Sequence, residues 1–308
     1  MKGPAYRVFK DGCPHHVYSR GINGNVVFYS LEDCVCYFTL YSHLARKYRI
    51  IVRAFTIMPN HVHSNEESDG VASFRAFHRD LNAIFTAEYN NAHDRSGPIF
   101  ESPFGYSPKT VGKKIRDNLC YIANNPVIGK LSDDILGYRW SLLAYHDNCF
   151  PFSEKIVLRH ASRPLRRSVK LVNYFRSKDL PLIYCRLEQV FRALDNKERN
   201  QIMDYIIATY NCLGYKAMTA FYDSSFSKAC ESFRANSGSE HDIPEDYENY
   251  KVYAQMIRLA SSVGVDLVHC NFETTGQQHR RKIVSLFHEY RFPERQIDRF
   301  LHREARGG

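Results

Sequence analysis

The feature that most constrains the fold is an alternation of strand-like and helix-like patterns over residues 1–145. Apolar residues recur near a 3.6-residue period, typical of amphipathic helices, at 31–48, 71–91 and 108–124. Stretches rich in β-branched and aromatic residues, typical of strands, lie at 13–30 (a strand, a turn and a short second strand), 50–63 and 99–106. We expect Pro126 to end the third helix. This order predicts an α+β fold, a ferredoxin-like sandwich of helices on an antiparallel sheet.

The second half of the chain has a different character, and a division into 1–150 and 151–308 is expected. A basic stretch at 155–170 opens it, and helical patterns dominate afterwards. Asp195 and Glu198 form a plausible capping box for a helix that ends at Tyr210. Further helices are expected at 247–262, 280–290 and 294–302. The last two suggest a helix-turn-helix with Arg295 and Arg299 on its second helix, although an ordinary helical hairpin fits equally well.

Charge and cysteine usage narrow the class of partner. The net charge of +9 and the pI of about 9.0 indicate a polyanionic partner, most often a nucleic acid. Nine cysteines with no CxxC pair fit a reducing cytoplasm rather than a disulfide framework. No apolar run is long enough to span a membrane, and no membrane partner is expected.

The sharpest local motif is His61-Val62-His63, in a segment that begins at Met58. On a strand, the two-residue period directs both imidazoles to one face, where they could bind one metal ion. A solvated strand face is the ordinary explanation of such a pair. The polar residues 64–69 that follow predict that the strand either stops at His63 or continues with an exposed end.

A second motif, 121–127, lies at the end of the third predicted helix. Tyr121 and Asn125 are four residues apart and therefore share a helix face. Taken alone, this pair is more typical of an ordinary amphipathic helix end with Tyr121 half-buried.

Together the two motifs suggest phosphodiester chemistry. A tyrosine, with a pKa near 10, is a poor nucleophile at neutral pH, and a metal ion that polarises a phosphate makes its attack feasible. Two imidazoles and an amide oxygen suit Mg²⁺ or Mn²⁺, while Zn²⁺ stays open.

These residues carry a resemblance to a known family. The segment 58–63 resembles the histidine–hydrophobic–histidine motif of HUH endonucleases, and 121–127 resembles the tyrosine segment of single-tyrosine transposases. The match is closest to the REP-associated tyrosine transposases and their insertion-sequence relatives. Residues 16–21 and 138–141 resemble the first strand and the closing segment of that family, so the resemblance covers about residues 13–146 in collinear order.

The resemblance implies an activity and a site. Such enzymes attack single-stranded DNA, often hairpin-containing, with the tyrosine. They form a 5′-phosphotyrosine bond and release a 3′-hydroxyl. The 3′-hydroxyl of a second strand later attacks the phosphotyrosine and reverses the bond. Tyr121 would be the nucleophile, and His61, His63 and Asn125 the ligands of a divalent Mg²⁺ or Mn²⁺. A homodimer is compatible with this reading.

A DNA path is expected to combine a cationic groove with aromatic platforms. The candidate groove residues share a positive charge and lie near the two motifs; they are Arg20, Arg75, Arg79, Lys109, Lys113, Lys114 and Arg116. Each of them, taken singly, is more often a solvated charge.

Three other functions stay open. One is a replication initiator or relaxase with the same chemistry, and another is a catalytically silent, domesticated DNA-binding protein. The third is a zinc-stabilised structural module, which the absence of a cysteine or third-histidine ligand set argues against.

Overall fold

The structure, a computed structural model, describes residues 8–101, 104–238, 249–265 and 277–303. Its centre is a four-stranded antiparallel sheet in the order β2-β3-β1-β4. The strands are β1 (His15–Arg20), β2 (Ile51–Met58), β3 (His61–Glu67) and β4 (Gly105–Pro108). The expected α+β class with an antiparallel sheet is therefore observed.

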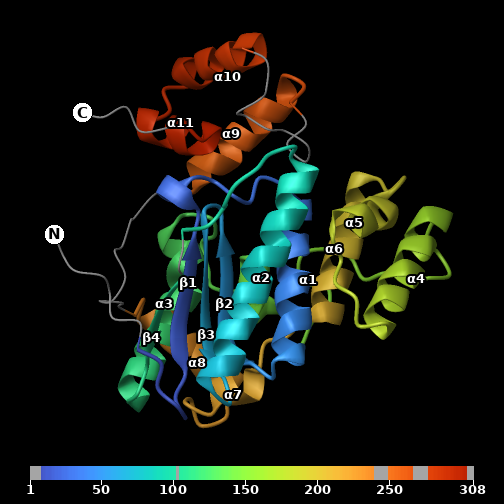
Figure 1. The fold of residues 1–308 in the computed structure, drawn as a ribbon. Helices are drawn as coiled ribbons and strands as arrows, with labels where there is room; N and C mark the ends of the chain where they lie inside the picture. The colour runs from blue at the N-terminus through green and yellow to red at the C-terminus, as the bar shows by residue number, and fades with distance from the viewer. Residues whose placement is uncertain (1–7, 102–103, 239–248, 266–276, 304–308) are drawn as a thin grey trace.

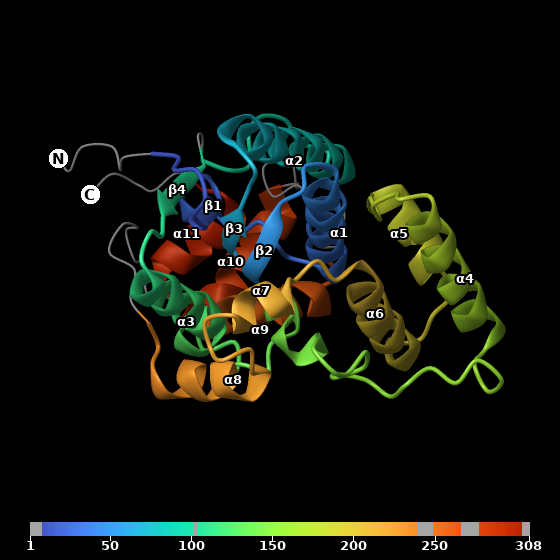
Figure 2. The same cartoon turned by 90° about the horizontal axis from the view of Figure 1, so that it is seen from below.

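Helices cover both faces of this sheet (Figures 1 and 2). Helices α1 (Leu31–Lys47) and α2 (Val71–Ala92) pack on one face, and α3 (Gly112–Ile128) packs on the other. A capping box fixes the start of α1, since Ser30 and Asp33 bond each other's backbone N–H groups. The helices expected at 31–48 and 71–91 are confirmed, because their apolar stripes face the sheet.

The strand expected at 50–63 is instead a hairpin. Pro59 and Asn60 form the turn between β2 and β3, and the second strand continues to Glu67. The expectation that the strand stops at His63 or has an exposed end is wrong, because Glu66 is fully buried. Its carboxylate accepts hydrogen bonds from Tyr41 Oη at 2.6 Å and from Ser64 Oγ at 2.6 Å.

Three smaller expectations also need correction. The turn expected after the first strand is a 3₁₀ turn (η1, Ile22–Gly24), with Asn23 at φ 56°, but residues 25–30 do not form the short strand expected after it. The strand at 99–106 is reduced to β4 and a single bridge between Phe100 and Gly21. Pro126 lies inside α3, which ends two residues later.

The helical second half divides between two hydrophobic cores. Helices α5 (Tyr184–Phe191) and α6 (Asn196–Tyr210) lie beside α1, and α4 (Arg163–Ser177) packs on their outer side. Helix α7 (Tyr215–Thr219) lies near β2, and α8 (Phe226–Ala235) lies near α3. The predicted capping box at the start of α6 is present. The main core extends from Val27 to Phe233, so it runs through the expected division at residue 150.

The second core lies at one end of the sheet, above the β2–β3 turn (Figure 1). Helices α9 (Lys251–Ser262), α10 (Gln277–Glu289) and α11 (Glu294–Leu301) surround it, and the helical pair expected at 280–302 is present. Val26, Tyr29 and Met58, from the first half of the chain, complete this core. In the part of the chain that the structure describes, no helix is long and apolar enough to cross a membrane.

Candidate functional site

Strand β3 presents two different sets of side chains to the two faces of the sheet. Val62, Ser64 and Glu66 face α1 and α2, as the Tyr41–Glu66 hydrogen bond indicates. His61 and His63 face α3. The prediction that both histidines share one face of the strand is therefore confirmed.

A third histidine joins this pair. Strand β1 is antiparallel to β3, with Tyr18 opposite His63, and it contributes His16 to the same face. His16 Nε2 lies 3.0 Å from His63 Nδ1, and the ring centroids of His61 and His63 are 4.7 Å apart. Sequence reasoning missed His16, although its two-residue spacing from Tyr18 on a strand-like segment was a usable signal.

Helix α3 brings Tyr121 to these histidines. The ring centroid of Tyr121 is 5.5 Å from that of His63 and 5.7 Å from that of His16, in edge-on contact. Only 7% of Tyr121 is exposed. Residues 61–63 and 121, far apart in the chain, therefore meet in one cluster, as the two motifs taken together predicted.

A buried amide pair joins α3 to the strand that carries the histidines. Asn65 Nδ2 donates to Asn118 Oδ1 at 2.8 Å, and both side chains are almost fully buried. Asn118 precedes Tyr121 by one helical turn, so the bond fixes the helix at the height of the tyrosine. Sequence reasoning did not single out either residue.

The environment keeps His63 uncharged. Burial lowers its pKa well below the usual value, and the neighbouring His61, His16 and Arg20 lower it further. A neutral imidazole can accept a proton or bind a metal, whereas a protonated one can do neither.

The histidine pair fits a metal ion in one respect. Nδ1 of His61 contacts Asn60 Oδ1 at 2.6 Å, which favours a lone pair on His61 Nε2, whereas the contact of His63 Nδ1 with His16 Nε2 leaves a lone pair on His63 Nε2 only when His63 is the donor. Such second contacts are usual for metal-binding histidines. Among the described residues, however, no three histidine, cysteine, aspartate or glutamate side chains group as a metal site. A cation held by His61 and His63 would take a further ligand of another type, such as the Asn125 amide oxygen.

Asn125 lies one turn after Tyr121 and is partly buried. Its side-chain nitrogen contacts the Tyr121 carbonyl oxygen at 3.3 Å, which leaves the amide oxygen as the donor for a cation. The expected sharing of one helix face by Tyr121 and Asn125 agrees with this contact.

The C-terminal half covers the cluster, which the sequence did not predict. The Tyr250 ring lies 5.6 Å from the His61 ring, and Tyr250 N–H donates to Gly129 O at 3.0 Å. A Cβ on Gly238 would lie 2.5 Å from the Tyr121 backbone nitrogen, so this segment is packed directly onto α3.

The expected cationic groove is only partly assembled. Lys113, Lys114 and Arg116 are exposed on the first turns of α3, and Arg20 is half-buried on the histidine face. Lys109, another candidate, is 5% exposed, with Nζ 3.3 Å from Ser107 Oγ.

The remaining basic candidates lie elsewhere. Arg75 and Arg79 are exposed on α2, which covers the opposite face of the sheet. On α11, Arg299 is 7% exposed and packs against Gly24, so it does not present a DNA-reading surface.

Comparisons with known proteins give one distant likeness. No protein-family model and no curated protein matches the chain. Among solved structures, the chain is similar to a REP-associated tyrosine transposase bound to a REP hairpin, with 16% identity and a TM-score of 0.39. The match covers 46% of this chain and 82% of that one. A likeness this weak does not establish the family, and the function has to be inferred from the residues themselves.

Proposed function

We propose that the chain nicks and rejoins single-stranded DNA, with Tyr121 as the nucleophile, in the manner of an HUH single-tyrosine transposase. The observation that carries this proposal is the meeting of Tyr121 with His63 and His16 on one face of the sheet. A phenol beside the neutral imidazole of His63 is a sensible arrangement for nucleophilic attack on phosphate. The strand order β2-β3-β1-β4, with helices after β1 and β3, also agrees with a ferredoxin-like sandwich.

The reaction is a transesterification, in which a phosphodiester bond of the DNA is exchanged for a bond to the tyrosine. Tyr121 Oη bonds to the phosphorus as the bond from phosphorus to the 3′-oxygen breaks, which leaves a 5′-phosphotyrosine and a 3′-hydroxyl. The phenolic proton passes to solvent, because His16 Nε2 accepts from His63 Nδ1 when His63 binds the cation through Nε2, and His16 then has no free lone pair. The leaving 3′-oxygen takes up a proton. Attack by another 3′-hydroxyl reverses these steps and completes strand transfer.

His61, His63 and Asn125 would hold a divalent cation, Mg²⁺ or Mn²⁺. When bound, the cation would offset negative charge on the scissile phosphate. The amide pair of Asn65 and Asn118 positions Tyr121 at this point. Lys113 and Lys114 on α3 would guide the approaching strand.

The decisive test is a covalent-adduct assay. The full chain is mixed with labelled single-stranded DNA hairpins and Mg²⁺ or Mn²⁺, and a slow band is sought on a denaturing gel. Tyr121→Phe should abolish the band. Tyr18→Phe is the matched control, because Tyr18 also lies 6.5 Å from His63 between ring centroids. If Tyr18→Phe loses the band and Tyr121→Phe keeps it, the nucleophile is Tyr18 and the assignment to Tyr121 is wrong.

Metal binding is tested separately from chemistry. We expect His61→Ala to remove Mn²⁺ binding in titration calorimetry, while His160→Ala, which changes an exposed histidine, leaves it intact. Equal Mn²⁺ affinity in both variants would contradict the proposed ligand set.

A second candidate, a DNA-binding protein without catalysis, is favoured by one observation. Tyr121 is 7% exposed, and Gly238 and Tyr250 cover the surroundings of the cluster. Tight binding of a broad hairpin pool with no adduct under any metal condition would favour this candidate.

A further inference from the structure

Most of the net positive charge of the chain comes from one short segment. Residues 155–178 contain eight lysines and arginines and no aspartate or glutamate. The rest of the chain holds 34 basic and 33 acidic residues, so this segment supplies eight of the nine net positive charges. An excess charge that is concentrated in this way attracts a polyanion to one part of the surface.

Helix α4 carries several of these charges on one exposed face. The opposite side of the helix packs on α5 and α6, and Leu165, Val169 and Val172 are buried there. On the outer side, exposed side chains follow one another at intervals of three or four residues, which is about one helical turn. This basic face of α4 consists of Arg163, Arg166, Lys170 and Tyr174.

Acidic side chains do not offset the charges of the basic face. Arg176, near the end of α4, pairs with Asp179 at 3.4 Å. Among the residues that the structure describes, no carboxylate forms such an ion pair with Arg163, Arg166 or Lys170. Two guanidinium groups and one ammonium group therefore face solvent, where they can donate charge-assisted hydrogen bonds to the phosphates of a ligand.

Arg167 holds α4 in place instead of adding to the basic face. Its Nη2 donates to the Gln189 carbonyl oxygen at 2.9 Å and to the Arg192 carbonyl oxygen at 3.0 Å, at the end of α5. Ser162 caps the start of α4, since its hydroxyl accepts a hydrogen bond from the Leu165 N–H at 3.1 Å. The first turns of the helix are therefore fixed before any ligand binds.

The basic face lies apart from the histidine cluster. Helices α5 and α6 separate α4 from α1, which packs on the sheet face opposite to α3. In Figure 2, α4 therefore forms one edge of the molecule, while α3 lies towards the other edge. A ligand of the basic face thus occupies a surface that Tyr121 and the histidines do not use.

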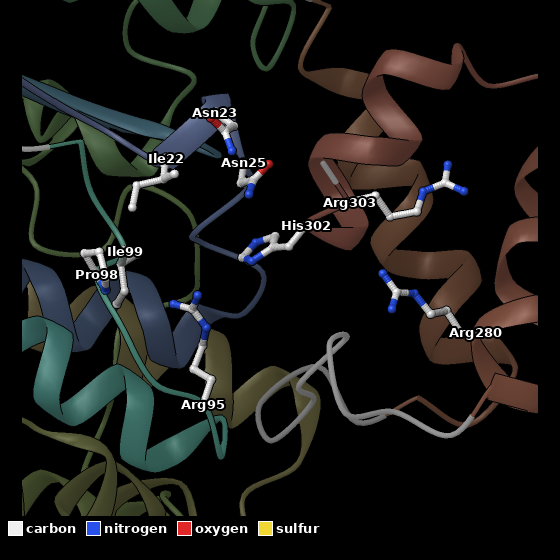
Figure 3. Close-up of a pocket in the computed structure, with 9 residues that line it drawn as sticks. All are labelled: Ile22, Asn23, Asn25, Arg95, Pro98, Ile99, Arg280, His302 and Arg303. Carbon is white, nitrogen blue, oxygen red and sulfur yellow. The ribbon is translucent and has the colours of Figure 1, made fainter. Parts of the chain in front are cut away.

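Arginines also gather in a cavity of about 500 Å³ beside the C-terminal helices, where Arg95, Arg280 and Arg303 line the wall (Figure 3). There Arg303 pairs with Glu294 at 2.8 Å and with Asp298 at 2.7 Å, both on α11. These carboxylates offset its charge and fix the end of α11. Arg303 is thus explained by contacts within the protein, in contrast to the cations on the basic face of α4.

The shape of the basic face favours a double helix over other polyanions. The apolar side of α4 is buried in the protein, so the helix cannot lay an apolar face into a membrane surface. Binding of a single strand usually combines a groove with several aromatic platforms, whereas this convex face has one aromatic member, Tyr174, which is 55% exposed. Double-stranded DNA carries about one negative charge per 1.7 Å of its axis, which a row of cations along a helix can follow.

We propose that the basic face of α4 binds the phosphate backbone of double-stranded DNA. This site goes beyond the proposed reaction and does not depend on it, because α4 lies apart from Tyr121. Arg163, Arg166 and Lys170 would each contact backbone phosphates without reading the bases. Such contacts would hold the protein on duplex DNA while a single strand reaches the histidine cluster.

The test measures the binding of duplex DNA without divalent metal, so that no strand is cut. The full chain is titrated into a fluorescein-labelled DNA duplex of mixed sequence at several salt concentrations, and fluorescence anisotropy gives the Kd. The test variant is Arg166→Gln with Lys170→Gln. The control variant is Arg75→Gln with Arg258→Gln, which removes the same charge from exposed positions on α2 and α9.

The expected loss of affinity follows from counterion release. Each lost phosphate contact on double-stranded DNA lowers the salt slope of log K by about 0.9, which corresponds to about 8-fold in affinity at 0.1 M relative to 1 M salt. The test variant should therefore bind roughly 60-fold more weakly at 0.1 M salt, with a slope reduced by about 1.8. The control variant should change both quantities far less, although its net charge is the same.

A variant that keeps the charge separates loss of charge from loss of structure. Arg166→Lys with Lys170→Arg should bind the duplex as the wild type does, because both positions keep a cation. A loss of affinity equal to that of the test variant would overturn the proposal. Both glutamine variants should keep the wild-type unfolding midpoint, because the positions are exposed and glutamine, arginine and lysine have similar helix propensities.

Three further results would overturn the proposal. An unchanged Kd and salt slope in the test variant would show that the basic face does not touch the duplex. A loss of affinity for a single strand of the same length, with the duplex affinity retained, would assign the face to single-stranded DNA. Displacement of the duplex by polyglutamate as readily as by unlabelled duplex would identify a site for acidic proteins. Failure of the covalent-adduct assay, in contrast, would refute the chemistry of Tyr121 and leave the expected loss of duplex binding unchanged.

Discussion

The amide pair between β3 and α3 gives the sharpest prediction about how the site is held. Asn65 and Asn118 are buried, and their hydrogen bond of 2.8 Å joins the histidine strand to the tyrosine helix. Replacing one partner by leucine leaves the other buried amide without that bond, which costs about 1–3 kcal/mol. We therefore expect Asn65→Leu and Asn118→Leu each to lower the free energy of unfolding by this amount.

The double variant should lose less than the sum of the two single losses. Replacing both partners by apolar groups of similar shape removes the unsatisfied amide and can be nearly neutral. The coupling free energy between the two positions, measured by a double-mutant cycle, should therefore be favourable by roughly 1–3 kcal/mol. Urea unfolding of the wild type, both single variants and the double variant gives this coupling.

The catalytic consequence is measured in the adduct assay. A shift of Tyr121 by about 1 Å can cost on the order of 100-fold in rate, so both single variants should form adduct much more slowly than wild type. Losses of stability that add within about 0.5 kcal/mol would mean that the two amides are not coupled. That result would refute the role of the pair as the clamp of α3.

Three further predictions concern the cover of the cluster and its protonation. Gly238→Ala should destabilise the fold by at least about 1 kcal/mol, because φ is +73° and a Cβ would meet the α3 backbone at 2.3 Å. Gly264→Ala is the control in thermal unfolding, because its φ of +84° brings the same backbone strain but its Cβ would meet no atom within 4 Å. Burial lowers the pKa of His63 in the folded protein. As the pH falls below about 6.5, the unfolded chain therefore binds more protons than the folded one, and the free energy of unfolding should drop by up to about 1.4 kcal/mol per pH unit. Urea midpoints between neutral and mildly acidic pH measure this, and a His63→Gln variant with the same slope would contradict it. Tyr250→Leu should raise the rate at which diethyl pyrocarbonate modifies His61 several-fold, as mass spectrometry of the peptide would report, and an unchanged rate would mean that the Tyr250 ring does not shield it.

The parts of the fold that the sequence predicted are those set by local periodicity. Helices α1 and α2 bury one continuous apolar stripe, so their patterns were sufficient. The β2–β3 hairpin was missed because its two-residue turn, Pro59-Asn60, interrupts an apolar segment that reads as one strand. The end of β3 was missed for a different reason: Glu66 is polar, and only hydrogen bonds from Tyr41 and Ser64 make its burial possible.

The same limit applies to the candidate site. Residues 61–63 and 121 carried recognisable motifs, and the structure brings them together. His16, Tyr250 and the Asn65–Asn118 pair have no motif, because each acts through a contact between segments distant in the sequence. The burial of Lys109 could not be read from the sequence either, since a charge is typical of a surface position and only the packing beside Ser107 buries it.

The second core has a consequence for the order in which the chain folds. Val26, Tyr29 and Met58 are synthesised well before the helices α9, α10 and α11 that bury them. The β2–β3 turn next to His61 therefore keeps an exposed apolar surface until these helices are synthesised. More than 190 residues of intervening chain separate Met58 from Tyr250, its partner in this core. Docking of such distant partners is slow compared with local helix formation. A nascent chain would thus pass through a state in which the sheet is formed and the end nearest His61 is still uncovered, a state that chaperones and proteases would meet before the finished protein.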